Sequence, residues 1–89
     1  MQIVKPAAAG TMESSDVYVE VGPGDQGLQL SLESVVSQQF GDSILQTVRE
    51  VLEENMVENA VVRIVDRGAL ACVIRARVET AILRGKGDA

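Results

Sequence analysis

The sequence predicts a small two-layer α+β domain, in which a short sheet of about three to four strands packs against two amphipathic helices. Its 89 residues suffice for one modest core. That core must be aliphatic, because hydrophobic residues make up 46% of the chain and only Tyr18 and Phe40 are aromatic. The hydrophobic spacing changes from two to three or four near residue 35, which separates early strands from a helix. We expect residues 1–89 to form a single domain with a flexible tail at 85–89.

The first part of the chain predicts strands. Residues 17–21 place Val at every second position and residues 28–32 do the same with Leu, so each predicts a strand with one buried face. The segment 22–27 between them is rich in turn-forming residues, and we therefore expect the two strands to pair as a hairpin. Residues 7–12 can supply a further extended segment. That segment leads into an exposed turn at 13–16, whose Ser and Asp side chains favour local bends.

The second part predicts two helices and one more strand. A helix is expected from about Val35, with Ser34 as its N-cap. Its buried stripe comprises Val36, Phe40, Ile44, Val48, Val51 and Leu52. Residues 60–65 form a β-branched run that predicts a third strand, ended by the turn formers at 66–68. The last segment predicts a second helix with Leu70, Val73, Ile74, Val78, Ala81 and Ile82 on its apolar stripe.

Charge and composition exclude several functions. The net charge of -5 argues against nucleic-acid binding, which relies on Lys and Arg, and suits docking onto basic partner clefts. The chain has no His, the commonest general base and metal ligand, which makes catalysis by this chain alone improbable. Cys72 is its single Cys, so an internal disulfide and a zinc cluster are excluded, and we expect its thiol to be buried. No signal-peptide core or membrane span is evident, which predicts a cytoplasmic protein.

Three stretches together resemble one family, the acyl carrier subunit (gamma chain) of citrate lyase. The first is Ala9-Gly10-Thr11-Met12-Glu13-Ser14-Ser15-Asp16-Val17. The second is Gln39-Phe40-Gly41-Asp42, and the third is Asp66-Arg67-Gly68-Ala69-Leu70, which runs through Cys72 and on to Arg75-Ala76-Arg77-Val78-Glu79. The likeness spans nearly the whole chain, in the same order and at similar spacing. The resemblance therefore implies one acyl carrier domain.

The resemblance also implies a chemistry. In this family, 2′-(5″-phosphoribosyl)-3′-dephospho-CoA is joined by a phosphodiester to the serine that corresponds to Ser14. Its thiol carries acetyl or citryl while citrate is cleaved to acetate and oxaloacetate. The chain would then be a non-catalytic carrier subunit. The implied partners are the transferase (alpha) and lyase (beta) subunits, the prosthetic-group synthase and the acetate-loading ligase, with no nucleic acid and no membrane.

Other interpretations of these residues stay open. Residue chemistry alone does not separate Ser14 from its neighbour Ser15, and only the position in the motif favours Ser14. Arg75 and Arg77 could grip phosphates of the arm or acidic patches on a partner, or form a solvated face in which Arg75 pairs with Glu79. A nucleophilic role for Cys72 is disfavoured because no His is present to activate it. The chief alternative function is an unmodified α+β interaction or regulatory module, and a standalone enzyme ranks third.

Overall fold

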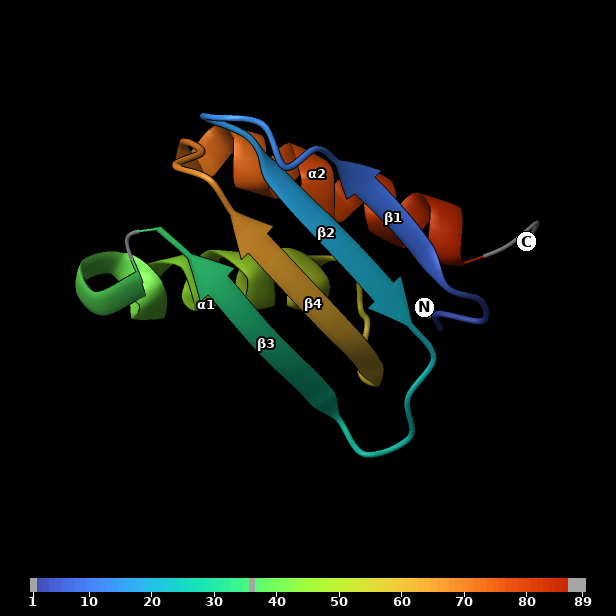
Figure 1. Ribbon diagram of the computed structural model, residues 1–89. Helices are drawn as coiled ribbons and strands as arrows, with labels where there is room; N and C mark the ends of the chain where they lie inside the picture. The colour runs from blue at the N-terminus through green and yellow to red at the C-terminus, as the bar shows by residue number, and fades with distance from the viewer. Residues whose placement is uncertain (1, 36, 87–89) are drawn as a thin grey trace.

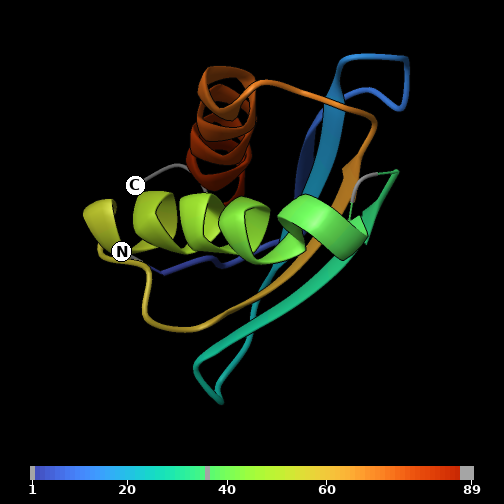
Figure 2. The same ribbon diagram turned by 90° about the vertical axis from the view of Figure 1, so that its left-hand side faces the viewer.

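The computed structural model describes residues 2–35 and 37–86 of the chain. Its elements follow in the order β1 (Ala7–Gly10), β2 (Val17–Gly22), β3 (Leu28–Ser34), α1 (Ser37–Glu54), β4 (Ala60–Asp66) and α2 (Ala71–Gly85). The strands form one sheet, and both helices lie on the same face of it (Figures 1 and 2). The predicted two-layer α+β class is thus confirmed.

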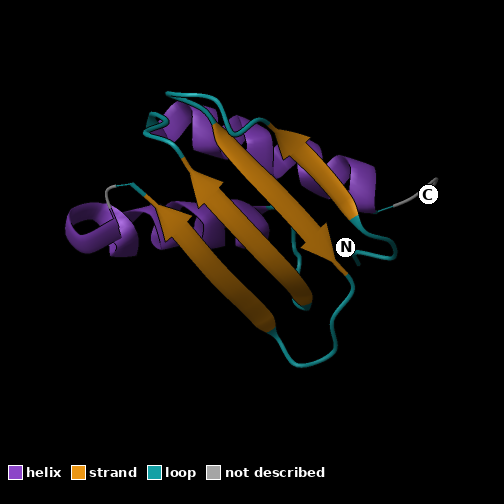
Figure 3. Ribbon diagram, viewed as in Figure 1, coloured by secondary structure: helices purple, strands orange, loops and turns teal. Residues whose placement is uncertain are grey.

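The order of the strands differs from the prediction. They lie in the order β1-β2-β4-β3, so β4 separates β2 from β3 and the predicted hairpin is wrong (Figure 3). β4 pairs antiparallel with β2 and parallel with β3. Central placement suits β4, because Ala60, Val62 and Ile64 are fully buried, whereas β3 at the edge has no buried residue. The segment 22–27 is long enough to pass the end of one intervening strand, roughly 10 Å across the sheet.

The core lies between the sheet and the two helices and is aliphatic, as predicted. Val17, Val19 and Val21 of β2 face the helices together with the buried side chains of β4. The helices contribute Ile44, Val48, Val51, Leu52, Ile74, Val78, Ala81 and Ile82. Burying one such side chain contributes about 1.5–3 kcal/mol, so this set outweighs any single polar contact in holding the fold.

The beginning of α1 corrects two predictions. Ser34 does not cap the helix: it ends β3, and its hydroxyl donates to Asp66 Oδ2 at 2.8 Å. Phe40 is not a core residue, because its side chain is 53% exposed. It lies in the first turn of α1, which projects beyond the end of the neighbouring strand (Figure 1). Val36, predicted for the buried stripe, falls outside the described residues.

The second helix begins and ends differently from the prediction. Leu70 precedes α2 as its N-cap residue and is 71% exposed. Cys72 is exposed rather than buried, because it lies about 200° around the helix from the buried Ile74. Gly85 is not part of a tail: it is buried in α2, and its carbonyl accepts hydrogen bonds from the backbone N–H groups of Val4 and Lys5. The rest of the predicted tail, residues 87–89, lies outside the described residues.

None of the helices in the described part of the chain is both long enough and apolar enough to span a membrane.

Candidate functional site

Ser14 belongs to the turn that joins β1 to β2, and this turn lies at the end of the sheet where β4 also ends (Figure 1). Ser14 and Ser15 are both exposed. Ser15 adopts the left-handed backbone conformation with φ of 67°, and its N–H donates to the carbonyl of Arg67 at 2.8 Å. The turn is closed by the Asp16 N–H, which donates to the carbonyl of Glu13 at 3.1 Å. The geometry therefore fixes the backbone on one side of Ser14 and leaves its hydroxyl accessible.

Asp16 joins the turn to the rest of the domain. Its carboxylate accepts the Thr11 hydroxyl at Oδ2 and the Val17 N–H at Oδ1, both at 2.7 Å. Arg77 on α2 adds a bidentate pair, with Nε and Nη2 each 3.1 Å from one carboxylate oxygen. The hydroxyl of Thr11, followed by Arg77 and the Val17 N–H, lowers the pKa of Asp16 from 3.8 to about 2. Asp16 is thus a stable anion at neutral pH and a poor acceptor of protons.

Gly10 explains why the chain can turn so tightly before Ser14. It has a φ of +91°, and a Cβ placed on it would lie 1.9 Å from the carbonyl oxygen of Val17. The same Cβ would lie 3.3 Å from Cδ of Arg77. The Oγ1 atom of the adjacent Thr11 accepts a hydrogen bond from the Glu13 N–H, and the same hydroxyl donates to Asp16. Only glycine fits where β1 passes so close to β2, so the geometry requires Gly10, whereas Thr11 contributes two side-chain hydrogen bonds to the turn.

The segment 66–70 between β4 and α2 supports the turn from the other side. The Arg67 N–H donates to the carbonyl of Asp16 at 2.9 Å, which complements the bond from Ser15 to Arg67. Asp66 is 1% exposed, and its carboxylate accepts the Ser34 hydroxyl and the Ala69 N–H. Asp66 therefore shapes this segment, and the segment in turn holds the backbone on both sides of Ser15.

The structure separates the two arginines that the sequence grouped together. Arg77 reaches the turn through Asp16. Arg75 instead faces α1, where its guanidinium lies 2.6 Å from Glu54 and 3.6 Å from Glu50. The predicted pairing of Arg75 with Glu79 is therefore wrong, because carboxylates on the neighbouring helix lie within reach.

Sequence reasoning missed the role of Asp16. The residue lies inside the motif that was recognised, but its partner Arg77 is 61 positions further along the chain. Such a contact has no signal in local spacing. The one available hint was that both residues belong to the stretches that resemble the same family.

Within the described residues, no group of three or more His, Cys, Asp or Glu side chains could hold a metal ion. The site consists instead of an exposed hydroxyl on a turn that hydrogen bonds and an ion pair hold in place. Such an arrangement suits a serine that receives a group from another protein.

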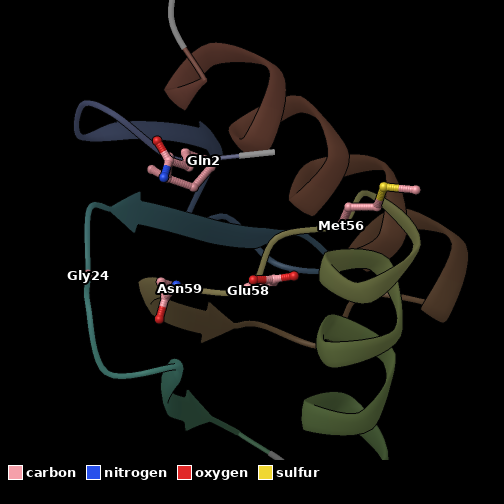
Figure 4. Close-up of a pocket in the computed structure, with 6 residues that line it drawn as sticks. Gln2, Gly24, Met56, Glu58 and Asn59 are labelled. Atoms are coloured by element: carbon pink, nitrogen blue, oxygen red, sulfur yellow. The ribbon is translucent and has the colours of Figure 1, made fainter.

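A separate pocket of about 390 Å³ lies at the opposite end of the sheet, where β2 ends and β4 begins (Figure 4). It is lined by Gln2, Ile3, Gly24, Met56, Glu58 and Asn59. The amide oxygen of Asn59 accepts the Gly27 N–H at 2.8 Å and so braces the neighbouring loop. This pocket is remote from Ser14 and does not contribute to the site.

Comparisons with known proteins agree with the resemblance. A family model described as ACP, malonate decarboxylase delta subunit (MdcD), matches residues 4–85. Citrate lyase acyl carrier protein 2 of Salmonella typhimurium is 54% identical over 85 residues, which cover 94% of this chain and 88% of the relative. The citrate lyase acyl carrier protein of Escherichia fergusonii is 55% identical over 94% of this chain and 88% of the relative. That of Vibrio cholerae is 52% identical over 94% of this chain and 87% of the relative.

One solved structure resembles the fold. It is a chain of a Pseudomonas malonate decarboxylase hetero-tetramer in complex with malonate, with a TM-score of 0.76 and 21% sequence identity. The likeness covers 94% of this chain and 91% of that chain. At this identity the comparison bears on the fold alone, and it agrees with the two-layer arrangement described above.

Proposed function

This chain belongs to the citrate lyase acyl carrier protein family, and from that premise we propose that it carries acyl groups on a prosthetic arm joined to Ser14. The observation that carries this proposal is the geometry of the turn. Ser14 is exposed at its tip, while Ser15 and Asp16 on one side are tied to Arg67 and Arg77. An attachment site needs both properties, because the hydroxyl must be accessible and the arm must leave the protein from a defined place.

The residues around Ser14 fit attachment by a separate enzyme. A phosphodiester forms when the Ser14 oxygen bonds to phosphorus, the bond from that phosphorus to the leaving group of the activated precursor breaks, and the Ser14 hydroxyl loses its proton. The chain has no His to take that proton. Asp16 lies two residues after Ser14, but its pKa of about 2 makes its carboxylate a weak base. Both carboxylate oxygens also already accept hydrogen bonds. In this proposal the synthase supplies the base, and this chain serves as its protein substrate.

We propose, from the family resemblance, that the arm is 2′-(5″-phosphoribosyl)-3′-dephospho-CoA, whose thiol would supply the acyl chemistry by carrying acetyl and citryl groups while citrate is cleaved to acetate and oxaloacetate. The chain itself contributes the attachment point and the surfaces that bind partner subunits. In this proposal it is a carrier and not a catalyst, and it works with the transferase and lyase subunits after loading by the synthase and the ligase. Tethering raises the effective concentration of the acyl group at each active site.

The proposal is tested by co-expressing the chain with its prosthetic-group synthase and measuring the intact mass, followed by peptide fragmentation. We expect a mass increase equal to the arm, located on Ser14. Ser14→Ala should abolish the increase and change the free energy of unfolding by less than about 0.5 kcal/mol, because the side chain is exposed.

Ser15→Ala is the matched control, since it removes an equally exposed hydroxyl one position away. It should still be loaded. Loading of Ser14→Ala but not of Ser15→Ala would move the attachment site by one residue. No adduct on the wild-type chain, with an active synthase and its precursor present, would contradict the carrier proposal and favour an unmodified interaction module.

A further inference from the structure

Exposed hydrophobic side chains gather at the end of the molecule that carries Ser14. We call this the carrier end, and define it as the turn 11–16, the segment 66–71 and the residues beside them at 33–35 and 40–47. Among the described residues, eight large hydrophobic side chains are exposed, and four of them lie here: Met12, Val35, Phe40 and Leu70. Grouped exposure of this kind marks a binding surface more often than scattered single residues do.

Two of these side chains line a groove. It lies between the first turns of α1 and the start of α2 and has a volume of about 390 Å³. Phe40, Ile44 and Thr47 form one wall, and the other is made by the segment that includes Ala69 and Leu70. The groove adjoins the attachment turn through the paired backbone hydrogen bonds that link Arg67 to Ser15 and Asp16. The groove therefore lies at the same end of the molecule as Ser14.

The charges at the carrier end indicate what can bind there. Its carboxylates are Glu13, Asp16, Glu33, Asp42 and Asp66, and its one cation is Arg67; counting Arg77 as well, which reaches Asp16 from α2, the formal charge is −3. Both arginines already face carboxylates, Arg67 toward Glu33 and Arg77 toward Asp16. Each of these two arginines thus already lies beside a carboxylate.

This charge decides between three occupants. A second copy of the chain would bring two negatively charged surfaces together. The arm on Ser14 carries phosphates, so folding it back onto the acidic carrier end is also unfavourable. An enzyme that binds a phosphate-bearing arm needs cations around the entrance of its active site, and such an entrance is attracted to this surface.

We propose that the groove of the carrier end, centred on Phe40 and Leu70, docks the acyl-transferase subunit through an apolar contact surrounded by cations of that subunit. The inference rests on the proposed carrier function, because it names the surface by which the partner approaches Ser14.

The test compares Leu70→Ser with Leu83→Ser. Both remove an exposed Leu from the region of α2, but Leu83 is 55% exposed near the far end of the helix, away from the groove. Leu70 is the N-cap of α2 and has an extended backbone without a side-chain cap, so Ser at this position can cap the helix and should not unfold it. Binding of each arm-free variant to the purified transferase subunit is measured by calorimetry, and arm loading by intact mass.

We expect Leu70→Ser to weaken transferase binding at least about fivefold, and Leu83→Ser to change it less than about twofold. Wild-type binding should also weaken as the salt concentration rises. Equal affinities for the two variants, or no binding of the wild-type chain, would overturn the docking inference while normal loading of Ser14 left the carrier function intact. Failure of the wild-type chain to take the arm would instead remove the carrier function, and the docking inference with it.

Discussion

The two ends of the sheet are both built from turns rich in Gly, Ser, Asp and Asn, yet they differ in what holds them. At the carrier end, Asp16 links the turn to α2 through a bidentate pair with Arg77. At the opposite end, the segment 22–27 is held by a backbone bond from Ala60 to Gly27 and by the amide of Asn59. That end contains the pocket shown in Figure 4 but no ion pair among the residues that line it.

The two ends also differ in how their contacts relate to their cavities. The pocket at the opposite end is polar and of similar volume to the groove, but no contact concentrates on a single reactive group there. The carrier end concentrates its contacts on one turn and leaves the hydroxyls of Ser14 and Ser15 exposed. The proposed site is therefore supported by accessibility combined with a fixed backbone, and not by a cavity.

The largest expected effect comes from replacing one glycine by alanine at each end of the sheet. Gly10→Ala should cost more than about 3 kcal/mol of unfolding free energy, because its Cβ would overlap the backbone of Val17 in addition to the strain of a positive φ. Gly27→Ala is the matched control: it has a φ of +80° but nothing within 4 Å, so it should cost only about 1 kcal/mol. Urea unfolding of both variants measures the difference. Equal costs would show that the close approach at Gly10 relaxes easily.

Removal of a carboxylate should have the next largest effect. Asp16→Ala leaves Arg77, the Thr11 hydroxyl and the Val17 N–H without their acceptor and should cost about 2–3 kcal/mol.

Glu20→Ala provides the comparison for Asp16→Ala. Glu20 also accepts one hydroxyl and one arginine, from Tyr18 and Arg63, but its side chain is 42% exposed on the open face of the sheet. Glu20→Ala should lower the free energy of unfolding by less than about 1 kcal/mol. If urea unfolding gave similar losses for Asp16→Ala and Glu20→Ala, the turn would not depend on the Asp16 network.

Unfolding at acid pH should reveal how much Asp16 contributes to stability. The pKa of Asp16 is about 2 in the folded protein, below its ordinary value of 3.8, so its contribution is present above pH 4 and is lost as the pH falls toward 2. Between pH 5 and 2, the wild-type chain should lose about 2 kcal/mol more stability than Asp16→Ala does. The pKa of Glu20 is also lowered, chiefly by the Tyr18 hydroxyl. Because Glu20 is present in both proteins, its contribution to the pH dependence cancels in the difference between them. Parallel pH profiles in urea unfolding would contradict this assignment.

The smallest expected effect is a gain in stability. Leu70→Ser supplies the missing cap of α2 and should raise the free energy of unfolding by about 0.5–1 kcal/mol. That gain corresponds to an increase of a few degrees in Tm for a domain of this size. Leu83→Ser lies on the exposed side of the same helix and should leave Tm nearly unchanged. A lower Tm for Leu70→Ser would show that the leucine packs into the groove more firmly than its exposure indicates.

Local patterns in the sequence predicted the elements and the core well. Alternation at 17–21 and in the β-branched run from residue 60 identified two strands, because a period of two directly reflects which face is buried. The helical stripes were confirmed from Ile44 to Leu52 and from Ile74 to Ile82. The sequence failed where burial depends on the ends of elements, as at Phe40 and Cys72, since spacing does not report where a helix leaves the sheet.

Long-range pairing was beyond reach for a different reason. The turn formers at 22–27 predict a reversal of the chain, but they carry no information on whether another strand enters between the two arms. β4 enters there because it is the most buried strand. For the site, the motif predicted Ser14, which remains a prediction, while the ion pair that holds its turn depends on a contact between residues 16 and 77.

The position of Arg67 and Arg77 late in the chain has a consequence for the order of events in the cell. Both groups that hold the attachment turn follow β4, the last strand to be synthesised and the one that joins the two halves of the sheet. During translation, the turn can gain these contacts only after residue 77 has left the ribosome. Order at Ser14 is thus acquired only when nearly the whole domain has been made, so a synthase that recognises the ordered turn would modify finished chains and pass over partial ones.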